Sequence, residues 1–248
     1  MNIFKEVAGR IFALWALLIF IITMLVVVPG MWAIGLVKEP KRTSIFRKIS
    51  KAWMSIFFAL AGCSLKVKGK ENFKEGETYI VICNHNSFMD VPVTTPFIPR
   101  ANKTIAKIEL SKIPVFGLIY KRGSILVDRN NKDSRRESFK KMKEVIAMGM
   151  HMCIYPEGTR NKTNLPLKSF HDGAFKLAID TKKSLLPAII FNTKKILPTH
   201  KIFFFWPSKM ELHFLPDIEI KNLDTAESLK ETAFNLMSNY YAAHHKPS

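Results

Sequence analysis

The sequence is poor in cysteine, and its few cysteines lack the spacing that most cysteine chemistry needs. Its 248 residues include only Cys63, Cys83 and Cys153, far apart and with no Cys-x-x-Cys pair. This argues against a disulfide framework or a zinc site and favours reduced thiols in a domain that faces the cytosol. The histidines show no metal-ligand spacing with carboxylates or cysteines, so we expect no metal and no other cofactor.

Acidic side chains are also scarce. Lysine and arginine number 38 against 20 aspartates and glutamates, a formal charge of +18. This excess predicts polyanionic partners: nucleic acid, an anionic lipid surface or phosphorylated small molecules. The aromatic run Phe203–Trp206 is contiguous rather than interleaved with basic residues, as a base-stacking platform would be. We therefore expect no nucleic acid as partner, and expect this run either to contact lipid or to form a buried strand.

Charge is absent altogether from Ile11 to Val37. A helix of this length would be about 40 Å long, against a hydrocarbon core of roughly 30 Å. The segment is longer than the apolar core of a typical signal peptide and no small-residue cleavage site follows it, so we predict a membrane anchor. Pro29-Gly30 is expected either to kink the helix or to end it.

A basic stretch follows the apolar segment, as expected for the cytoplasmic side of a membrane. Beyond it, Ala52 to Leu65 is too short to span comfortably, and could be a core helix, an interfacial helix or the second leg of a hairpin. We place the boundary between membrane anchor and catalytic-size domain at residue 63, giving parts 1–63 and 64–248. The anchor would comprise one span or a two-helix hairpin plus a basic linker with these residues: Lys38, Lys41, Arg42, Arg47, Lys48 and Lys51.

From Ser64 onward, short apolar runs alternate with helical stretches, which is typical of an α/β fold. A helix is predicted over Asp133–Met148, with a capping box at Ser134–Glu137, and another over Thr225–Tyr241, capped by Asp224 or Thr225. The predicted strands are Leu65–Lys68, Tyr79–Cys83, Lys103–Lys107, Ser124–Val127, His151–Tyr155, Leu185–Phe191 and Lys209–Phe214.

Polar groups follow several of these strands. His85 comes after the second, and Asp90 opens the next element. A turn between them could bring the carboxylate to one imidazole nitrogen and leave the other free as a proton acceptor. On spacing alone, a buried histidine beside an aspartate that only caps a helix is the more common arrangement.

Two further strand ends carry arginine. In Pro156–Arg160, Gly158 permits close backbone approach, Arg160 offers a planar fork for phosphate or carboxylate, and Glu157 could orient that arginine or a substrate hydroxyl. Arg129, after the fourth strand, could supply a second phosphate contact. Ligands of an α/β sheet gather at the carboxyl edge of its strands, although each motif alone could also be a solvated turn with surface charges.

In this order the motifs resemble the blocks of the glycerophospholipid acyltransferases, specifically of 1-acylglycerol-3-phosphate acyltransferases of the PlsC type. Asn84-His85 to Asp90 matches the N-H-x-x-x-x-D block, Gly123–Arg129 the second block, and Pro156–Arg160 the P-E-G-T-R block. Leu185–Ile190 stands where the fourth block belongs. The resemblance covers roughly residues 64 to 220, and the ordered set is far more specific than any one block. It implies an acyltransferase-type mixed sheet flanked by helices, with a membrane-embedded helical segment before it.

The sequence departs from the family pattern at two points. Between Pro166 and Phe175 it either inserts residues or places His171 where the family has lysine, which leaves open whether Lys168 and His171 contact substrate. In the fourth block Ser184 replaces the first of two usual prolines, while Pro187 keeps the second. Acyl-chain or acceptor preference could therefore differ.

The resemblance implies transfer of an acyl group from acyl-CoA or acyl carrier protein to the sn-2 hydroxyl of a lysophosphatidate at a phospholipid bilayer. His85 would be the general base and Asp90 would orient it. The substrate would be bound by Arg129, Glu157, Gly158, Thr159 and Arg160. A thiolate leaves readily near neutral pH, so no acyl-enzyme is required.

Several alternatives stay open. If a covalent intermediate forms, its candidate nucleophiles are Ser87, Cys83 and Cys153. The acceptor could instead be glycerol 3-phosphate, another lysophospholipid or an amino-acid lipid, and the protein could be a membrane-anchored lipid-binding module without activity. We expect the catalytic domain at the cytoplasmic face of a membrane of the bacterial inner-membrane type.

Overall fold

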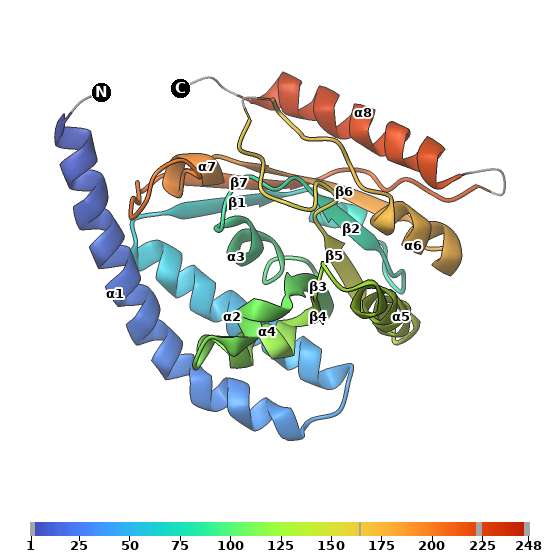
Figure 1. Cartoon of the computed structure of the whole chain (residues 1–248), viewed down its shortest axis with the longest axis horizontal. Helices are drawn as coiled ribbons and strands as arrows, with labels where there is room; N and C mark the ends of the chain where they lie inside the picture. The colour runs from blue at the N-terminus through green and yellow to red at the C-terminus, as the bar shows by residue number, and fades with distance from the viewer. Residues whose placement is uncertain (1–2, 164, 222–224, 246–248) are drawn as a thin grey trace.

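The fold is built on one seven-stranded sheet, seen in a computed structural model that describes residues 3–163, 165–221 and 225–245 (Figure 1). All seven predicted strands are confirmed, with ends that shift by one residue at most. Their bounds are β1 Ser64–Lys68, β2 Ile80–Cys83, β3 Asn102–Lys107, β4 Ser124–Val127, β5 His151–Ile154, β6 Leu185–Phe191 and β7 Lys209–Phe214.

The strand order is β1-β7-β6-β2-β5-β3-β4. The five strands from β6 to β4 run parallel to one another, whereas β7 is antiparallel to β6 and β1 runs parallel to β7. The sheet is therefore mixed, as expected. Because the five parallel strands point the same way, the polar residues after β2, β4, β5 and β6 meet at a single edge.

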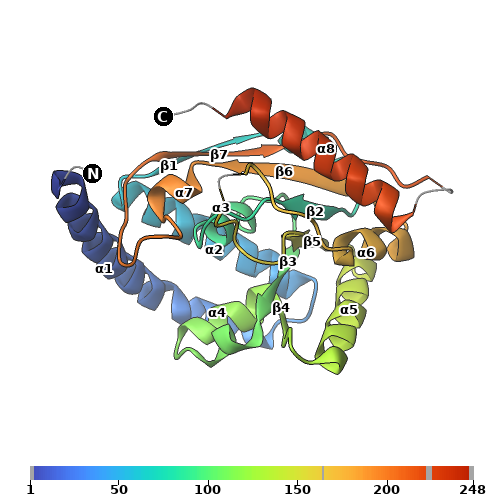
Figure 2. The same cartoon turned by 45° about the horizontal axis from the view of Figure 1, so that its top comes forward.

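Helices cover both faces of the sheet (Figure 2). Helices α5, α6 and α8 pack on one face, and α1 to α4 with the short α7 pack on the other. In β2 the side chains alternate between the two resulting cores, Ile80 and Ile82 facing one and Val81 and Cys83 the other. Burial of each such side chain contributes about 1.5–3 kcal/mol. The helices are α1 Ile3–Ala33, α2 Lys41–Leu60, α3 Asp90–Thr94, α4 Phe116–Gly123, α5 Lys132–Ala147, α6 Gly173–Thr181, α7 Thr193–Ile196 and α8 Ala226–His244.

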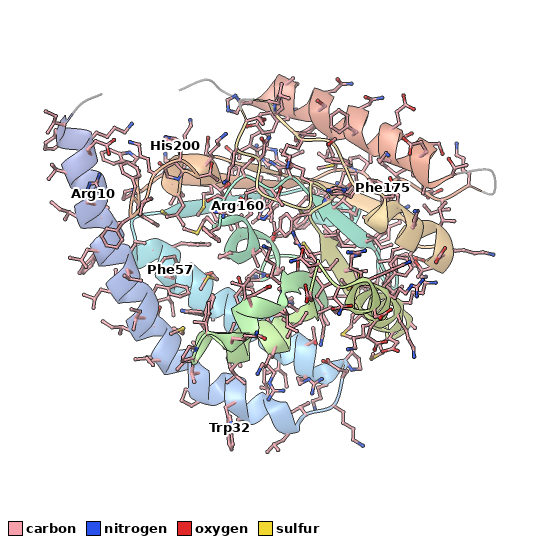
Figure 3. All side chains as sticks on the ribbon, in the orientation of Figure 1. Arg10, Trp32, Phe57, Arg160, Phe175 and His200 are labelled. Carbon is pink, nitrogen blue, oxygen red and sulfur yellow. The ribbon has the colours of Figure 1, made fainter. Side chains whose placement is uncertain are left out.

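Helix α1 contacts the domain along one narrow stripe. Small residues such as Ala13 and Ala16 allow close packing there, and the Thr23 hydroxyl accepts a hydrogen bond of 2.9 Å from the Trp53 indole. Away from this stripe the surface stays apolar: Val26, for example, is 75% exposed, and Trp32 points away from the domain in Figure 3. Among the described residues, Ile3–Leu36 is the helical segment long and apolar enough to cross a membrane. The helix continues through Pro29 rather than ending there.

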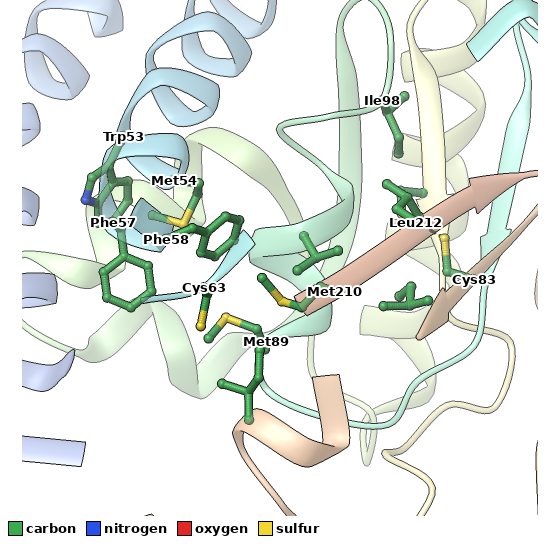
Figure 4. Packing of buried hydrophobic residues seen from close by; sticks show 14 of the residues in the cluster. Trp53, Met54, Phe57, Phe58, Cys63, Cys83, Met89, Ile98, Met210 and Leu212 are labelled. Atoms are coloured by element: carbon green, nitrogen blue, oxygen red, sulfur yellow. Dashed lines mark hydrogen bonds between the residues drawn. The ribbon is translucent and has the colours of Figure 1, made fainter. Parts of the chain in front are cut away.

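Helix α2 begins earlier than the sequence predicts. The basic residues from Lys41 to Lys51, expected in a linker, form its first half. Its second half covers most of Ala52–Leu65, the segment whose place was left open. This half is a core helix, because Trp53, Phe57 and Phe58 are buried in the core (Figure 4). The helix also turns back along α1, so the two form a hairpin (Figure 1).

Buried residues of this hairpin and of the sheet share one continuous core. Ala16 and Trp53 lie before the proposed boundary at residue 63, and Val81 and Leu212 lie after it. The division into parts 1–63 and 64–248 stays a prediction about how the two parts fold and function.

Helix caps were predicted with mixed success. Thr225 caps α8 in a capping box with Ser228, while Asp224, the alternative cap, lies outside the described residues. The capping box predicted at Ser134–Glu137 is wrong, because Asn131 caps α5 by accepting bonds from the backbone of Asp133 and Ser134. The Ser134 hydroxyl instead accepts the backbone N–H of Asp128, which fixes the chain just after β4.

Candidate active site

The structure brings His85 and Asp90 into direct contact. The turn after β2 places Asp90 at the start of α3, with its Oδ2 atom 2.8 Å from His85 Nδ1. A carboxylate in this position accepts the Nδ1 proton and so favours the tautomer in which Nε2 has a free lone pair. Among the described residues, no hydrogen bond occupies Nε2. The His85 side chain is 19% exposed, whereas that of Asp90 is fully buried.

Asp90 is held by three more groups. Its Oδ2 atom accepts the backbone N–H groups of Asn86 and Ser87 at 2.5 and 2.7 Å. Its Oδ1 atom accepts the hydroxyl of Thr193 at 2.6 Å. Thr193 is itself fully buried at the start of α7, directly after β6. A buried carboxylate with this set of donors keeps one orientation, and it keeps the His85 ring in one orientation too.

Two neighbours further restrict the loop that carries His85. The Tyr155 ring packs against the imidazole, with ring centroids 4.5 Å apart, and its hydroxyl lies 2.5 Å from Thr94 Oγ1. The Asn84 side chain exchanges two hydrogen bonds with the backbone of Ile190 on β6. The loop is thus fixed to both strands that flank β2.

Glu157 contacts backbone rather than the arginine it was expected to orient. Its Oε1 atom accepts the N–H of His85 at 2.8 Å, and its Oε2 atom accepts the N–H of Lys168 at 3.0 Å. No bond to Arg160 is present among the described residues. Burial raises the pKa of Glu157 to about 7, although both N–H groups act in the opposite direction. Glu157 therefore joins two sequence motifs through the backbone, and a contact with substrate stays a prediction.

Gly158 is required by its surroundings. Its φ is +68°, in the left-handed region, and a Cβ atom there would lie 2.7 Å from Cδ2 of His171. His171 thus packs against the loop after β5, whichever of the two departures from the family pattern it represents. Lys168 also reaches this loop, with its Nζ donating to Thr159 Oγ1 at 2.8 Å.

The two arginines expected to bind phosphate lie at the same edge. Arg129, after β4, is exposed and donates from Nη1 to the carbonyl of Gly158. Arg160 stacks on the Phe88 ring, its guanidinium carbon 3.5 Å from the ring centroid. Phe88 belongs to the His85–Asp90 turn, so each arginine is tied to a different part of the site. We call these two guanidinium groups the anion-binding rim, because such planar cationic forks suit phosphate; that they bind an anion stays a prediction.

The candidate nucleophiles for a covalent intermediate are all occupied or buried. Ser87 has no exposed surface, and its hydroxyl donates to the carbonyl of Leu197 at 2.9 Å. Cys83 and Cys153 are fully buried with their sulfur atoms 3.9 Å apart. Burial raises the pKa of the Cys83 thiol well above its ordinary value, which disfavours the thiolate. The geometry gives the covalent alternative no accessible nucleophile among these three.

A partly open apolar pocket of about 90 Å³ adjoins the site. One of its walls is α3, which begins with Asp90. The opposite walls come from α1, α2, α4 and β3, and carry the side chains of Phe20, Phe46, Trp53 and Phe116. Such a pocket has the character needed for a hydrocarbon chain.

Two contributors to the site were not predicted from the sequence. Thr193 follows β6, and a polar residue after a parallel strand is a signal that could have pointed to it. Tyr155 was taken only as the end of β5, and nothing in its sequence context indicates the contact with His85.

The comparisons with known proteins agree with this geometry. The model described as Acyltransferase matches residues 64–191. A 1-acyl-sn-glycerol-3-phosphate acyltransferase of Borreliella burgdorferi is 30% identical over 183 residues, which cover 71% of this chain and 70% of that protein. One of Helicobacter pylori is 33% identical over 148 residues, 59% of this chain and 61% of that protein.

Plant relatives are longer. A chloroplastic 1-acyl-sn-glycerol-3-phosphate acyltransferase of Arabidopsis thaliana is 31% identical over 163 residues, and the chain spans only 45% of its length. Among solved structures, the acyltransferase PlsC of Thermotoga maritima aligns with a TM-score of 0.82 at 22% identity, covering 98% of this chain and all of that one. This likeness confirms the predicted fold class. With the matched region spanning β1 to β6 and the motifs that meet at the sheet edge, the chain belongs to the acyltransferase family.

Proposed function

We propose that the protein transfers an acyl group from acyl-CoA or acyl carrier protein to the sn-2 hydroxyl of 1-acyl-sn-glycerol 3-phosphate. The observation that carries this proposal is the 2.8 Å contact between His85 Nδ1 and Asp90 Oδ2, which would leave Nε2 free to act as a base on a side chain that is 19% exposed. The names of the relatives support the acceptor. A lipid-binding module without activity would need no such base.

In the proposed reaction, His85 Nε2 takes the proton of the acceptor hydroxyl as its oxygen attacks the thioester carbonyl. Asp90 stabilises the imidazolium that forms. The new ester C–O bond forms, the C–S bond breaks, and the thiolate takes up the proton from the imidazolium. The thiol formed has a pKa of about 8.5 in its free state, so departure of the thiolate needs little acid assistance.

The anion-binding rim would hold the acceptor phosphate. Arg129 would reach the phosphate from the loop after β4, and Arg160 from the loop after β5. Gly158 and Thr159, which precede Arg160 in the chain, would complete the phosphate site. Charge-assisted hydrogen bonds of this kind contribute about 1.5–3 kcal/mol each. The reaction as proposed uses no metal or other cofactor.

The apolar face of α1 suits membrane association, because both the acceptor and the product are amphiphilic lipids. The exposed apolar side chains of this helix would lie among lipid tails, while the basic residues of α2 would favour anionic headgroups. We place the catalytic domain at the cytoplasmic face of the membrane.

The test is acyl transfer by the purified protein in detergent, with labelled acyl-CoA or acyl carrier protein and a panel of lysolipids, glycerol 3-phosphate and amino-acid lipids. We expect product from lysophosphatidate, acylated at sn-2. His85→Ala should lower turnover by about two to four orders of magnitude, while His200→Ala, an exposed histidine, should not. Transfer to another acceptor alone would overturn the substrate assignment, and near-normal turnover of His85→Ala would overturn the mechanism.

A further inference from the structure

Unpartnered polar atoms gather around the apolar pocket. Among the described residues, five buried side-chain nitrogen or oxygen atoms lack a hydrogen-bond partner, and all five belong to α2, β3 or α4, which wall this pocket. They are Arg47 Nε, Ser50 Oγ, Asn102 Oδ1, Thr104 Oγ1 and Arg122 Nε. Buried polar groups without partners are uncommon in folded proteins, so five in one place call for an explanation.

Two of the five residues line the pocket directly. Ser50 and Thr104 are only 5% and 3% exposed, and both contribute to its walls. Two of the other three contact its walls. Arg47 donates weakly from Nη1 to the carbonyl of Pro96, and Asn102 donates from Nδ2 to that of Thr95; both partners line the pocket. Arg122 precedes the lining residue Gly123 in the chain, but its guanidinium lies against Gly35.

Other buried hydroxyls of the chain do find partners. In α5, Ser138 is as buried as Ser50, and its hydroxyl donates to the carbonyl of Arg135, one helical turn earlier. Thr94, which is fully buried, makes the same kind of bond within α3, and the half-buried Thr181 does so within α6. Ser50 sits in the middle of α2, where this bond is also within reach, yet its oxygen has no partner. Among the described residues, the fully buried side-chain nitrogen and oxygen atoms without a partner therefore all lie in the elements around this pocket.

A plain hydrocarbon chain in the pocket would leave these groups without partners, and each such group costs about as much as it would gain from a hydrogen bond. The two groups that line the pocket, the hydroxyls of Ser50 and Thr104, can each donate and accept. A carbonyl or an anion could only accept from them. A ligand hydroxyl can accept from one of them and donate to the other, so it suits both.

We propose that this pocket binds a part of an acyl chain that carries a hydroxyl group, and that the protein selects such chains over plain ones. This rests on the proposed function. The chain could belong to the acyl donor or to the lysophosphatidate, because both bring a hydrocarbon tail to His85. Ser50 and Thr104 would be the residues that determine specificity.

The experiment is a competition assay with the full-length protein in detergent. In one arm, the donors are palmitoyl thioesters and their monohydroxy analogues, with the hydroxyl at different carbons, and they compete for plain lysophosphatidate. Each donor is tested both as the coenzyme A thioester and as the acyl carrier protein thioester. In the other arm, plain donors meet plain and hydroxylated lysophosphatidate. We expect kcat/KM to favour one hydroxylated isomer by about tenfold in one of the arms, the effect of a single well-made hydrogen bond.

Variants assign the preference to the pocket. Ser50→Ala combined with Thr104→Val should bring the ratio of hydroxylated to plain product close to one. Ser138→Ala makes the same serine substitution at equal burial on the opposite face of the sheet, and should leave the ratio unchanged. Thr104→Val should also raise the melting temperature of the free protein, because an apolar group replaces an unpartnered hydroxyl of similar shape.

Three outcomes separate this inference from the proposed function. Equal use of plain and hydroxylated chains in both arms overturns the inference while the proposed function stands. A lower melting temperature for Thr104→Val, without any preference, means that ordered water fills the pocket, and equally overturns it. If no acyl transfer occurs at all, the proposed function fails. The inference is then tested by the melting temperature of the protein with free palmitate and with its hydroxylated isomers. A larger increase with one hydroxylated isomer supports the inference, and equal increases overturn it.

Discussion

The carboxylate of Glu157 lies 2.8 Å from the backbone nitrogen of His85 and accepts its hydrogen bond. Through this contact the loop after β5 fixes the loop after β2, and the return bond from Asn161 N to the carbonyl of His85, at 2.6 Å, does the same from the other side. The two motifs are 72 residues apart in the chain. The conformation of the loop that carries His85 therefore depends on a residue that does not touch the imidazole nitrogens.

The protonation of Glu157 should make stability depend on pH. Burial raises its pKa from 4.5 to about 7, so between these values the folded protein holds a proton that the unfolded chain has lost. Relative to Glu157→Gln, the free energy of unfolding of the wild type should fall by roughly 3 kcal/mol as pH rises from about 4.5 to 7. Chemical unfolding in detergent at a series of pH values measures this.

Glu75→Gln is the matched control, since Glu75 is exposed, and it should follow the wild-type profile. A difference between the wild type and Glu157→Gln that stays constant over this pH range would mean that the two N–H groups keep Glu157 charged throughout.

Much of the fold could be predicted from the sequence because its signals are local. Short apolar runs rich in β-branched residues, such as Tyr79–Cys83, identify buried strands by themselves, and a polar residue after each one points to the sheet edge. The start of α2 could not be read in this way. Its basic first half has no apolar face strong enough to indicate a helix, and only packing of Phe46 and neighbouring residues against the domain reveals it.

The candidate site was predictable as a set of residues but not as a set of contacts. The sequence indicates His85, Asp90 and Arg160, yet it offers Glu157 an arginine or a substrate hydroxyl as partner and gives no sign of its bond to the backbone of His85. Thr193 donates a hydrogen bond to Oδ1 of Asp90, the oxygen that His85 does not contact. This bond depends on how the chain turns after β6. Such choices arise from tertiary packing, which residue spacing does not encode.

Thr193 should act as a positioning residue for the His85–Asp90 pair. Its hydroxyl donates to Asp90 Oδ1 at 2.6 Å in a fully buried site, and a hydrogen bond to a charged group contributes about 1.5–3 kcal/mol. Thr193→Val should lower kcat by roughly 10- to 100-fold with little change in KM for lysophosphatidate. Thr193→Ser keeps the hydroxyl and should restore most of the turnover.

A purely structural role for Thr193 would give a different pattern. Thr193→Val would then lower the melting temperature without a selective effect on kcat, and Thr193→Ser would not restore turnover beyond what it restores in stability. Steady-state kinetics together with thermal unfolding of both variants distinguish the two cases.

Arg160 should act on acceptor binding more than on chemistry. Its guanidinium is held over the Phe88 ring at the anion-binding rim, so Arg160→Ala should raise KM for lysophosphatidate by roughly 10- to 100-fold, the loss of one charge-assisted interaction, with a much smaller change in kcat. Arg136→Ala removes an equal charge from the exposed face of α5 and should leave KM unchanged. An unchanged acceptor requirement in Arg160→Ala would refute the role of this arginine in phosphate binding.

His151 should weaken the fold at low pH. It is fully buried at the start of β5, where its Nδ1 accepts the N–H of Tyr79 at 3.0 Å. Burial, and secondarily the charge of Arg100, lowers its pKa from 6.5 to about 3. Between these values His151 is protonated in the unfolded chain but neutral in the folded protein. The free energy of unfolding therefore falls by about 1.4 kcal/mol for each pH unit below 6.5.

The pH dependence due to His151 opposes that due to Glu157 over the range they share, from about pH 4.5 to 6.5, so the wild-type profile alone cannot show either. His151→Asn keeps an acceptor for Tyr79 but does not titrate. Relative to this variant, the wild type should lose stability steadily as pH falls from 6.5 toward 3. His200→Asn, at an exposed position, should follow the wild type. If His151→Asn has the same pH profile as the wild type, then His151 is protonated in the folded protein, and its hydrogen bond to Tyr79 cannot persist in acid.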